Sequence, residues 1–334
     1  MIRYPDILTQ IAERIRLSDN IVITCHERPD GDAAGSMLGL AHVLSSTGSQ
    51  VSCYCTDRVN GNLSFLPGAD KVLSELPDPL PGGTTLVIVD CNEAERLGSH
   101  GARLVRQADE VLVLDHHMGK GLCRETGMDN CLQYIDPDMS AAACICILLA
   151  RELGITLSRE AATCFYTAIV TDTGCFRHSN TTSMTFAMAG MLVDAGADPA
   201  DTALCLYQNK AVGSIHLLNR ILDTFSTEAG GRIGVIHVTP EMFIQSGASE
   251  SDMDDYIHYP RSVATVEAAV FVKELEKGRV SVSLRSKREL NVQAIAREYG
   301  GGGHFHAAGF KREGSAPEVR QMIVDRLRME FPED

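Results

Sequence analysis

The sequence predicts an α/β protein, with a mostly parallel, doubly wound sheet in an N-terminal domain and a smaller α/β domain after it. From Asn20 onward, short apolar runs alternate with helix-like stretches, which is the pattern of a doubly wound sheet. The length of 334 residues exceeds that of one typical domain, so two domains are expected. The glycine pair Gly230-Gly231 marks a boundary between them.

The N-terminal domain is expected to begin with a strand at 21–25, a polar loop at 26–32 and a small-residue helix at 33–44. Further short apolar runs predict strands at 51–55, 86–89, 111–114 and 132–135. After Pro137 the pattern becomes helical, and helices are predicted at 140–153, 159–170 and 183–195.

The second half of the chain begins with two predicted helices between 201 and 225. Beyond Gly230-Gly231, strands are predicted at 233–238, 265–272 and 280–284, followed by a helix at 292–299, a glycine run and a final helix at 316–329. The expected organisation is therefore a first domain at 1–195, a helical linker at 196–230 and a second domain at 231–334.

Composition narrows the class of protein. Hydrophobic residues make up 44% and charged residues 22%, as in ordinary globular proteins, and no apolar run reaches membrane-spanning length, so we expect a cytoplasmic protein with no membrane partner. The 11 cysteines lie mostly in apolar segments, which favours reduced, buried thiols over disulfides. The net charge of −14 argues against coating of long nucleic acid, so any phosphate must be bound locally by a metal or a small basic patch.

One apolar run ends in groups that can bind metal or move protons. Residues 111–114 are typical of a buried strand, and Asp115, His116 and His117 follow directly. A single polar residue there would ordinarily be a strand end at the surface. A carboxylate and two adjacent imidazoles at the carboxyl end of a strand, where α/β folds bind their ligands, favour a functional site.

Two other strands end in similar residues. The loop after the first strand holds His26, Asp30 and Asp32, and Asp90 ends the third strand. With Gly31 between them, the two loop aspartates can point to similar sides and reach two ions. The alternative is a helix cap, because Asp32 precedes a predicted helix; capping would account for Asp32 but not for His26 or Asp30.

A fourth segment that could supply a metal ligand is Thr171-Asp172-Thr173-Gly174, through Asp172. This could be an ordinary helix C-terminal turn, but a negative charge there opposes the helix dipole, a cost that a bound cation would offset. The full set is rich in carboxylates, contains imidazole and lacks thiolate, which suits Mn²⁺ or Mg²⁺. Because several carboxylates in one site repel one another, we expect two divalent ions about 3.5–4 Å apart, a common arrangement for phosphoester hydrolysis.

In this order the motifs resemble those of the DHH phosphoesterase family: H-x-x-x-D-x-D from His26, the strand-end Asp90, D-H-H from Asp115 and T-D-T-G from Thr171. Segments 283–287 and 300–310 resemble the DHH-associated nucleotide-binding domain. The resemblance covers nearly the whole chain and is strongest to the nanoRNase branch, oligoribonucleases that also act as pAp phosphatases. It implies an active site in the cleft between the two domains.

The resemblance also implies roles for single residues. One of two Mn²⁺ ions, with Mg²⁺ as the alternative, would be held by His26, Asp30 and Asp90. The other would be held by Asp32, Asp90, His116 and Asp172. Asp90 would bridge the ions, His117 would contact the scissile phosphate, and Asp115 would orient the imidazoles, as carboxylates commonly do beside metal ligands. Asp90, His117 and Asp115 are thus the expected catalytic residues.

The C-terminal domain carries the expected substrate-binding groups. A glycine run leaves backbone N–H groups uncovered and lets a phosphate approach closely, although alone it would suggest a flexible loop. Arg285 and Lys287 alternate on one face of a strand end and supply positive charge, whereas Arg288 is typical of a solvated strand end. The expected substrate-binding residues are Arg285, Ser286, Lys287, Gly301, Gly302, Gly303, His304 and, as an addition, Arg261.

The resulting hypothesis is metal-dependent hydrolysis of very short RNA oligonucleotides and linear dinucleotides to mononucleotides, with dephosphorylation of pAp to AMP. A RecJ-like single-strand DNA exonuclease is disfavoured because the chain lacks room for an OB-fold and an aromatic-basic strand platform. An inorganic pyrophosphatase or exopolyphosphatase would not need a base-holding second domain. A non-enzymatic nucleotide sensor would have lost metal ligands, whereas every motif is filled, and homodimer formation is left open.

Two positions depart from the family pattern. His178 stands where relatives commonly have an aromatic residue after Arg177, and alanines at 141–143 replace small hydroxyl residues after Ser140. Both departures leave the expected metal site intact and bear on substrate preference.

Overall fold

The computed structural model describes residues 6–331 except 60, 120, 251, 252, 254, 255 and 277, and of residues 125, 275, 276 and 304 it describes the backbone alone. The chain divides into two compact units, Met1–Asn209 and Lys210–Asp334. Across the described residues, no helix combines the length and apolar character needed to cross a bilayer.

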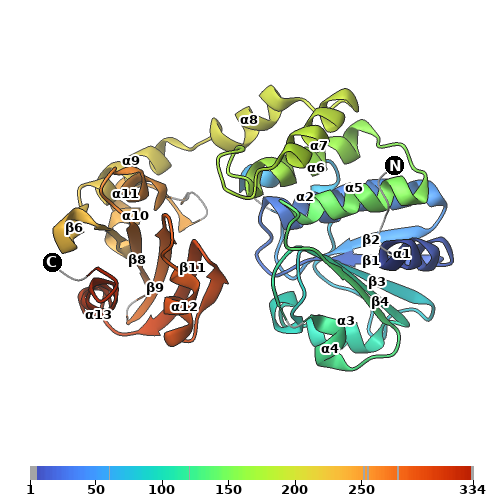
Figure 1. Cartoon of the computed structure of the whole chain (residues 1–334), viewed down its shortest axis with the longest axis horizontal. Coiled ribbons are helices and arrows are strands. Elements are labelled where there is room, and N and C mark those ends of the chain that lie inside the picture. The colour runs from blue at the N-terminus through green and yellow to red at the C-terminus, as the bar shows by residue number, and fades with distance from the viewer. Residues whose placement is uncertain are drawn as a thin grey trace. The chain divides into compact units, whose positions relative to one another are not determined.

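The N-terminal unit is built on a five-stranded sheet in the order β2-β1-β3-β4-β5, with every neighbouring pair parallel (Figure 1). The strands are β1 Asn20–Thr24, β2 Gln50–Tyr54, β3 Thr84–Val89, β4 Glu110–Asp115 and β5 Cys131–Ile135. The helices are α1 Asp6–Arg16, α2 Gly31–Leu44, α3 Gly101–Gln107, α4 Leu122–Thr126, α5 Ala142–Leu153, α6 Arg159–Asp172, α7 Ser183–Asp194 and α8 Pro199–Tyr207.

Both faces of this sheet are covered by helices. On β3, Leu86 and Ile88 join one core with residues of α3 and α4, whereas Val87 and Val89 join a second core with α1, α2, α5 and α6. This alternation follows from the two-residue period of a strand, and all six residues of β3 are buried. The predicted doubly wound parallel sheet is confirmed.

Helix α2 packs unusually close to α6 through a row of glycines at every fourth position, Gly31, Gly35 and Gly39. A methyl group built on Gly35 would lie 2.5 Å from the carbonyl oxygen of Cys164, and one on Gly39 would lie 2.5 Å from the ring of Phe165. Because residues four apart share one face of a helix, the row forms a groove that admits the α6 backbone. The start of α2 is thereby held against the end of α6.

The C-terminal unit contains a six-stranded mixed sheet in the order β10-β11-β9-β8-β7-β6, in which only β7 and β8 pair in parallel among the described strands. Its strands are β6 Ser226–Glu228, β7 Ile233–Val238, β8 Ala268–Glu276, β9 Arg279–Ser286, β10 Gly302–His304 and β11 Ala307–Glu313. Its helices are α9 Val212–Leu222, α10 Pro240–Ser246, α11 His258–Ser262, α12 Val292–Glu298 and α13 Ala316–Arg328.

Several predicted elements begin or end a few residues away from their predicted bounds, and for two of them the structure shows the reason. The strand predicted at 265–272 begins only at Ala268, because Val266 donates its backbone N–H to Val263 in a turn that follows α11. The helix predicted at 33–44 begins at Gly31, because Asp30 caps it. Short elements such as α4, α10, β6 and β10 were not predicted, since they carry too few residues for a periodic pattern.

Candidate metal centre

The predicted metal-binding residues of the N-terminal unit lie at one edge of its sheet. His26 follows β1, Asp90 follows β3 and Asp115 ends β4, and the carboxyl ends of parallel strands meet at the same edge. In the strand order, β1 lies between β2 and β3, so the chain winds in opposite directions on its two sides. Doubly wound proteins bind their ligands at such a switch point.

The structure brings these side chains into three overlapping groups whose potential ligand atoms lie within 4.8 Å of one another. Asp90 belongs to two of the groups, and so does His116. The groups are His26, Asp30 and Asp90; Asp32, His116 and Asp172; and Asp90, Asp115, His116 and His117. All side chains predicted to bind metal are therefore close together in one place.

Asp90 joins these groups through its two oxygens. Its Oδ2 lies 3.4 Å from Nε2 of His26, whereas its Oδ1 lies 3.5 Å from Nε2 of His116 and 3.3 Å from Nδ1 of His117. The residue is buried and has a φ of 54°, a left-handed conformation that is uncommon for a residue with a side chain. The sharp turn at the end of β3 aims the carboxylate between the histidines.

Two imidazoles are held with one nitrogen facing the carboxylates. Nδ1 of His26 lies 2.8 Å from the carbonyl oxygen of Glu27, and Nδ1 of His116 lies 3.0 Å from that of Met139. A carbonyl oxygen only accepts, so each Nδ1 must carry a hydrogen, which leaves Nε2 to face the cluster. Among the described residues, Nε2 of His116 and Oδ1 of Asp90 are buried without a hydrogen-bond partner, as expected of atoms that ligate a metal.

Asp115 supports the two histidines that follow it. It is completely buried, and its Oδ1 accepts hydrogen bonds from the backbone N–H groups of His116 at 2.7 Å and His117 at 3.1 Å. The same oxygen lies 2.8 Å from Nδ1 of His117. Asp115 therefore fixes the direction of the turn and the orientation of the His117 ring.

Asp30 and Asp32 make different hydrogen bonds to the backbone around the cluster. Asp30 caps α2, since its Oδ1 accepts from the N–H groups of Asp32 and Ala33 at 3.1 and 3.0 Å, so the capping alternative that was considered for Asp32 applies to Asp30 instead. Asp32 instead accepts from the N–H groups of Ala142 at 2.6 Å and Ala143 at 3.2 Å. The alanine segment at the start of α5 thus presents backbone donors to Asp32.

Asp172 ends α6, and its Oδ2 lies 3.8 Å from Nε2 of His116. The sequence analysis did not identify Asn180, whose side-chain amide lies 3.3 Å from Oδ2 of Asp172, 3.2 Å from its backbone oxygen and 3.1 Å from the backbone oxygen of Ser140. Asn180 therefore ties the end of α6 to the segment before α5. Nothing in the local sequence pattern indicated this contact.

His178, one of the two departures from the family pattern, packs against the backbone next to Asp172. A methyl group built on Gly174 would lie 2.4 Å from its Nε2. The intervening residues Gly174, Cys175 and Phe176 all have left-handed φ values, of 55°, 58° and 60°. Such backbone is costly for the two residues that are not glycine, and strain of this kind tends to gather at functional sites.

The charges in this cluster shift one another's protonation. Burial disfavours a charged His116, but Asp90, Asp32 and Asp172 outweigh it and raise its pKa to about 10. In the same way, neighbouring carboxylates overcome burial and raise the pKa of His117 to about 11. Burial raises the pKa of Asp172 to about 7, against the opposing effect of His116. Bound protons thus balance the negative charge of the carboxylates. A divalent cation at this site would supply that positive charge instead, and the protons would be released.

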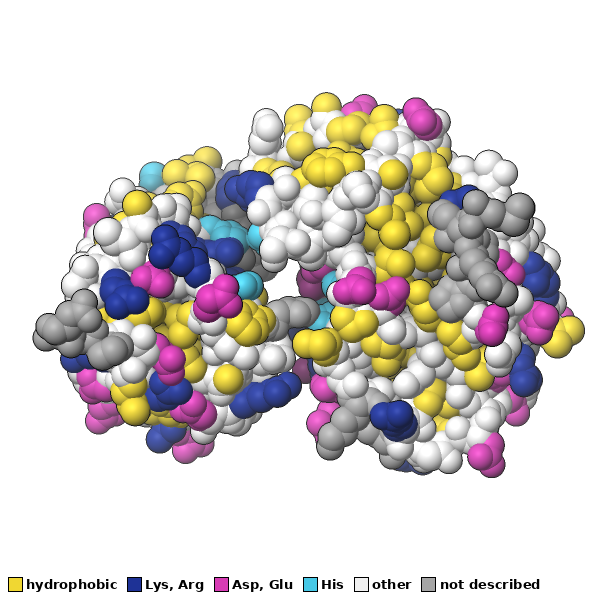
Figure 2. Space-filling model, in the orientation of Figure 1, with side chains coloured by type: hydrophobic (Ala, Val, Ile, Leu, Met, Phe, Trp, Pro, Cys, Tyr) yellow, Lys and Arg dark blue, Asp and Glu magenta, His cyan; other side chains and the backbone are white. Residues whose placement is uncertain are grey.

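The C-terminal unit holds the predicted substrate-binding residues around the end of β9. Ser286 is completely buried, whereas Nζ of Lys287 donates to the carbonyl oxygen of Val263 at 2.7 Å. Arg261 lies on α11, and the side chain of His304 lies outside the described residues. Figure 2 shows Lys and Arg side chains beside His side chains on one face of this unit.

The glycine run serves the packing of its own hairpin. A methyl group on Gly301 would lie 2.1 Å from the carbonyl oxygen of Gly309, and one on Gly303 would lie 2.4 Å from that of Ala307. Gly303 also has a φ of 133°. A methyl group on Gly302 would meet no atom within 4 Å. Of the three predicted glycines, Gly302 is therefore the one beside which a substrate group has room. Two of the three are therefore required by the fold itself.

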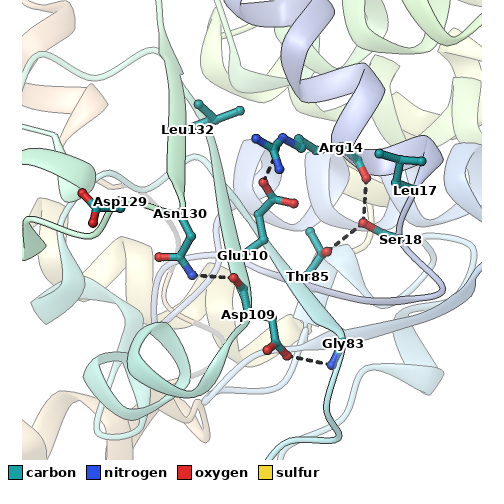
Figure 3. A pocket seen from close by; sticks show the side chains of 10 residues that line it. All are labelled: Arg14, Leu17, Ser18, Gly83, Thr85, Asp109, Glu110, Asp129, Asn130 and Leu132. Atoms are coloured by element: carbon teal, nitrogen blue, oxygen red, sulfur yellow. Dashed lines mark hydrogen bonds and ion pairs between the residues drawn. The ribbon is translucent and has the colours of Figure 1, made fainter.

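A hollow of about 430 Å³ lies at the opposite edge of the N-terminal sheet (Figure 3). Three of its charged groups are already engaged: Nε of Arg14 lies 3.4 Å from Oε1 of Glu110, and Asp109 accepts from the N–H of Gly83. Residues at the amino ends of β3 and β4 line it, so it is separate from the metal-competent cluster. The size of a hollow is therefore a poor guide to the chemistry of this protein.

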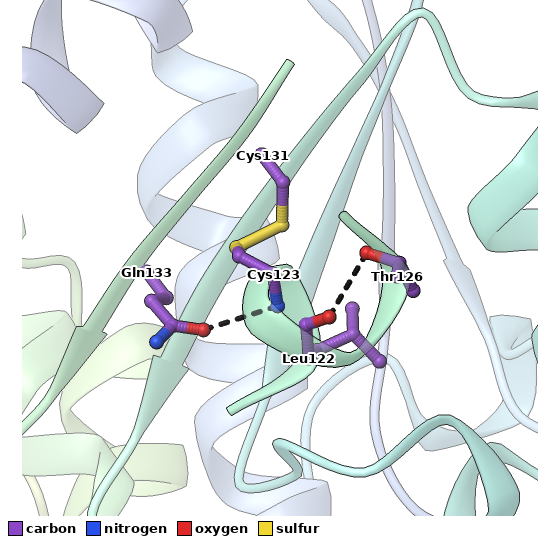
Figure 4. The surroundings of a disulfide bond; sticks show 5 residues. All are labelled: Leu122, Cys123, Thr126, Cys131 and Gln133. Atoms are coloured by element: carbon purple, nitrogen blue, oxygen red, sulfur yellow. Dashed lines mark hydrogen bonds between the residues drawn. A yellow bond between two sulfur atoms is a disulfide. The ribbon is translucent and has the colours of Figure 1, made fainter. Parts of the chain in front are cut away.

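The segment after His117 is tied to the sheet by a disulfide between Cys123 of α4 and Cys131 of β5 (Figure 4). The expectation of reduced thiols is wrong for this pair, because a short loop returns the chain so that the two residues lie side by side. The other nine cysteines are free, and seven of them are buried.

Comparisons with known proteins match both units of the chain. The model of the DHH family N-terminal domain matches residues 20–169, and that of the DHHA1 domain matches residues 219–331. A Thermus thermophilus protein named bifunctional oligoribonuclease and PAP phosphatase NrnA is 32% identical over 98% of this chain and 96% of its own.

Two solved structures show a similar fold. An exopolyphosphatase-related protein from Bacteroides fragilis superposes with a TM-score of 0.88 at 23% identity, covering 98% of each chain. RecJ from Thermus thermophilus, solved in complex with Mn²⁺, superposes with a TM-score of 0.59 at 16% identity, covering 100% of this chain and 56% of RecJ.

Proposed function

The chain belongs to the DHH family of phosphoesterases with a C-terminal DHHA1 domain, and from this premise we propose which phosphoesters it hydrolyses. The proposed substrates are very short oligoribonucleotides and linear dinucleotides, which are cleaved to mononucleotides, and pAp, which is dephosphorylated to AMP. The similarity to a bifunctional oligoribonuclease and PAP phosphatase over 98% of the chain supports this choice.

The observation that carries the proposal is the position of Asp90 between two ligand groups, one facing each of its oxygens. We assign one Mn²⁺ ion to His26, Asp30 and Asp90, and a second to Asp32, Asp90, His116 and Asp172. Mg²⁺ could replace Mn²⁺, since both prefer carboxylate ligands. When bound, such ions lower the pKa of a water molecule and neutralise charge on the phosphoryl oxygens.

His117 is the proposed contact to the scissile phosphate. Its Nδ1 is engaged by Asp115 at 2.8 Å, so a proton on its other nitrogen would be directed away from that carboxylate. Protonation of this ring would place a positive donor beside a phosphoryl oxygen. Asp115 contributes by holding the ring in one orientation, and Asn180 by holding the carboxylate of Asp172.

The proposed substrate grip is formed by the C-terminal unit. Arg285, Lys287 and Arg261 would supply positive charge to the phosphates, with the backbone around Gly302 and the side chain of His304 as further donors. Ser286 is buried, so its part is to support a neighbour instead of touching the substrate.

The proposal is tested by turnover of purified, chelator-treated protein to which Mn²⁺ or Mg²⁺ is added back. We expect hydrolysis of a labelled diribonucleotide and of pAp only after metal is restored. A single strand of about 20 nucleotides, long enough to engage a stacking channel, should be cleaved far more slowly. Absence of dinucleotide and pAp hydrolysis at saturating metal would refute the proposal, and preference for the long strand would favour a RecJ-like activity.

A further inference from the structure

The side chain of His306, which is not among the expected substrate-binding residues, is held in the C-terminal unit by the buried hydroxyl of Ser286. Nδ1 of His306 lies 2.9 Å from Oγ of Ser286, and the same oxygen lies 2.6 Å from the carbonyl oxygen of Leu290. Ser286 is 0% exposed, so this contact is shielded from water.

These two contacts determine which nitrogen of His306 carries the hydrogen. A hydroxyl has one hydrogen, and Ser286 must donate it to Leu290 because a carbonyl oxygen only accepts. Ser286 then accepts from His306, so Nδ1 is the protonated nitrogen and Nε2 of the neutral ring carries a lone pair. Burial and the nearby charge of Arg261 lower the pKa of His306, which favours this neutral form.

The turn that carries His306 is anchored by its backbone. The carbonyl oxygen of Phe305 accepts from the N–H of Val292 at 2.9 Å, and that of His306 accepts from the N–H of Ser286 at 3.1 Å. Among the residues that the structure describes, none forms a hydrogen bond to Nε2 of His306. A fixed, unused acceptor is therefore presented at the turn.

The surroundings of Nε2 suggest which part of a nucleotide meets it. The ring of Phe305 is 42% exposed and lies edge-on to His306 with centroids 4.7 Å apart, so it offers a face on which a base can stack. Lys287 follows Ser286 directly and, with Arg261, brings positive charge that suits a phosphate. Phosphate oxygens only accept at neutral pH, whereas a ribose hydroxyl can donate to a lone pair.

We propose that Phe305 and His306 form a ribonucleoside subsite in which Nε2 of His306 accepts a hydrogen bond from the ribose 2′-hydroxyl. The subsite rests on the proposed function, because it presumes a nucleotide substrate, and it adds a reason why RNA would be preferred to DNA. The 2′-hydroxyl is the group that allows a protein to tell the two apart. Ser286 is a positioning residue for this contact.

The test compares equilibrium binding of a fluorescently labelled diribonucleotide with that of its deoxyribose counterpart, using the full chain without added metal so that no turnover occurs. Wild type should bind the ribose form about five- to tenfold more tightly, the effect of one neutral hydrogen bond. His306→Phe keeps an aromatic ring but removes the acceptor, and it should bring the two affinities to within about twofold. His306→Gln restores an acceptor and should recover part of the preference.

Two further variants separate this contact from general effects. Phe305→Ala should weaken both ligands by a similar factor, since stacking does not depend on the sugar. His216→Phe makes the same exchange at an exposed position on α9 and should leave the ratio at its wild-type value. Equal binding of both sugars by wild type, or an unchanged ratio in His306→Phe, would overturn the inference. Loss of metal-dependent hydrolysis with an intact ribose preference would count against the proposed function instead.

Discussion

Two regions of the molecule fix a histidine ring through its Nδ1 and leave the other nitrogen available to a ligand. They are the metal-competent cluster around Asp90 and the turn that carries His306, and their surroundings differ. His26 and His116 are each fixed through Nδ1 by a backbone carbonyl, and His306 is fixed through Nδ1 by Ser286. In the first region the remaining nitrogens face buried carboxylates such as Asp90, whereas in the second the remaining nitrogen has no partner among the described residues.

This difference suits the two regions to different roles, the cluster around Asp90 to catalysis and the turn that carries His306 to substrate recognition. The buried cluster depends on charges that balance one another, so a change in one member disturbs all the others. The exposed turn depends on single contacts, and substitutions there should alter affinity without disturbing the fold. Substitutions in the two regions should therefore differ in size and in the kinetic constant they affect.

The largest effect is expected from Asp90→Ala. It removes the carboxylate shared between both proposed ions, which also faces three histidines, so kcat should fall at least about a thousandfold and Mn²⁺ binding should be lost. Calorimetric Mn²⁺ titration and dinucleotide turnover measure both. Asp129→Ala, at the opposite edge of the same sheet, is the control and should keep wild-type values. Two bound ions in Asp90→Ala would contradict the bridging role.

An intermediate effect is expected from Gly35→Ala, which tests whether helix spacing sets the cluster. Its methyl group would meet the backbone of Cys164 at 2.5 Å, so α2 and α6 must separate. We expect a loss of about 1–3 kcal/mol in the free energy of unfolding, as for other overpacked sites. Mn²⁺ affinity should fall as well, because Asp32 and Asp172 move apart.

Gly190→Ala on α7 is the matched control, since a methyl group there meets no atom within 4 Å. It should be neutral or stabilising by up to about 1 kcal/mol, because alanine favours helix. Urea unfolding and Mn²⁺ titration of both variants give the comparison. If Gly35→Ala matches Gly190→Ala in both measurements, close approach of the helices is not what positions the ligands.

The smallest effect is expected from Lys287→Ala in the C-terminal unit. Loss of one charged contact to phosphate should raise KM for the dinucleotide about five- to tenfold and leave kcat nearly unchanged. Arg288→Asn removes the same charge from the next residue, whose φ of 56° suits asparagine, and should change KM less than about twofold. Steady-state kinetics of both variants measure kcat and KM. A fall in kcat for Lys287→Ala would contradict the claim that the C-terminal unit acts on substrate affinity alone.

The sequence predicted the doubly wound sheet and the edge at which Asp90, Asp115 and His116 meet, because parallel strands align their carboxyl ends. It could not predict that Asp30 caps α2, since that depends on where the helix begins to within one residue. The contact between Asn180 and Ser140 joins residues 40 positions apart, and the glycine row acts only once α6 lies against it. Such features arise from tertiary packing between distant segments, which local sequence patterns do not predict.

With the proposed ion between them, the close packing of α2 and α6 would link the supply of metal to the stability of the folded chain. An ion shared by Asp32 and Asp172 would fasten the start of one helix to the end of another, and the unfolded chain offers no such pair. A ligand that binds only the native state stabilises it by about 2.7 kcal/mol at a hundredfold excess over its dissociation constant. Removal of the metal would then lower the stability of the folded protein as well as its activity.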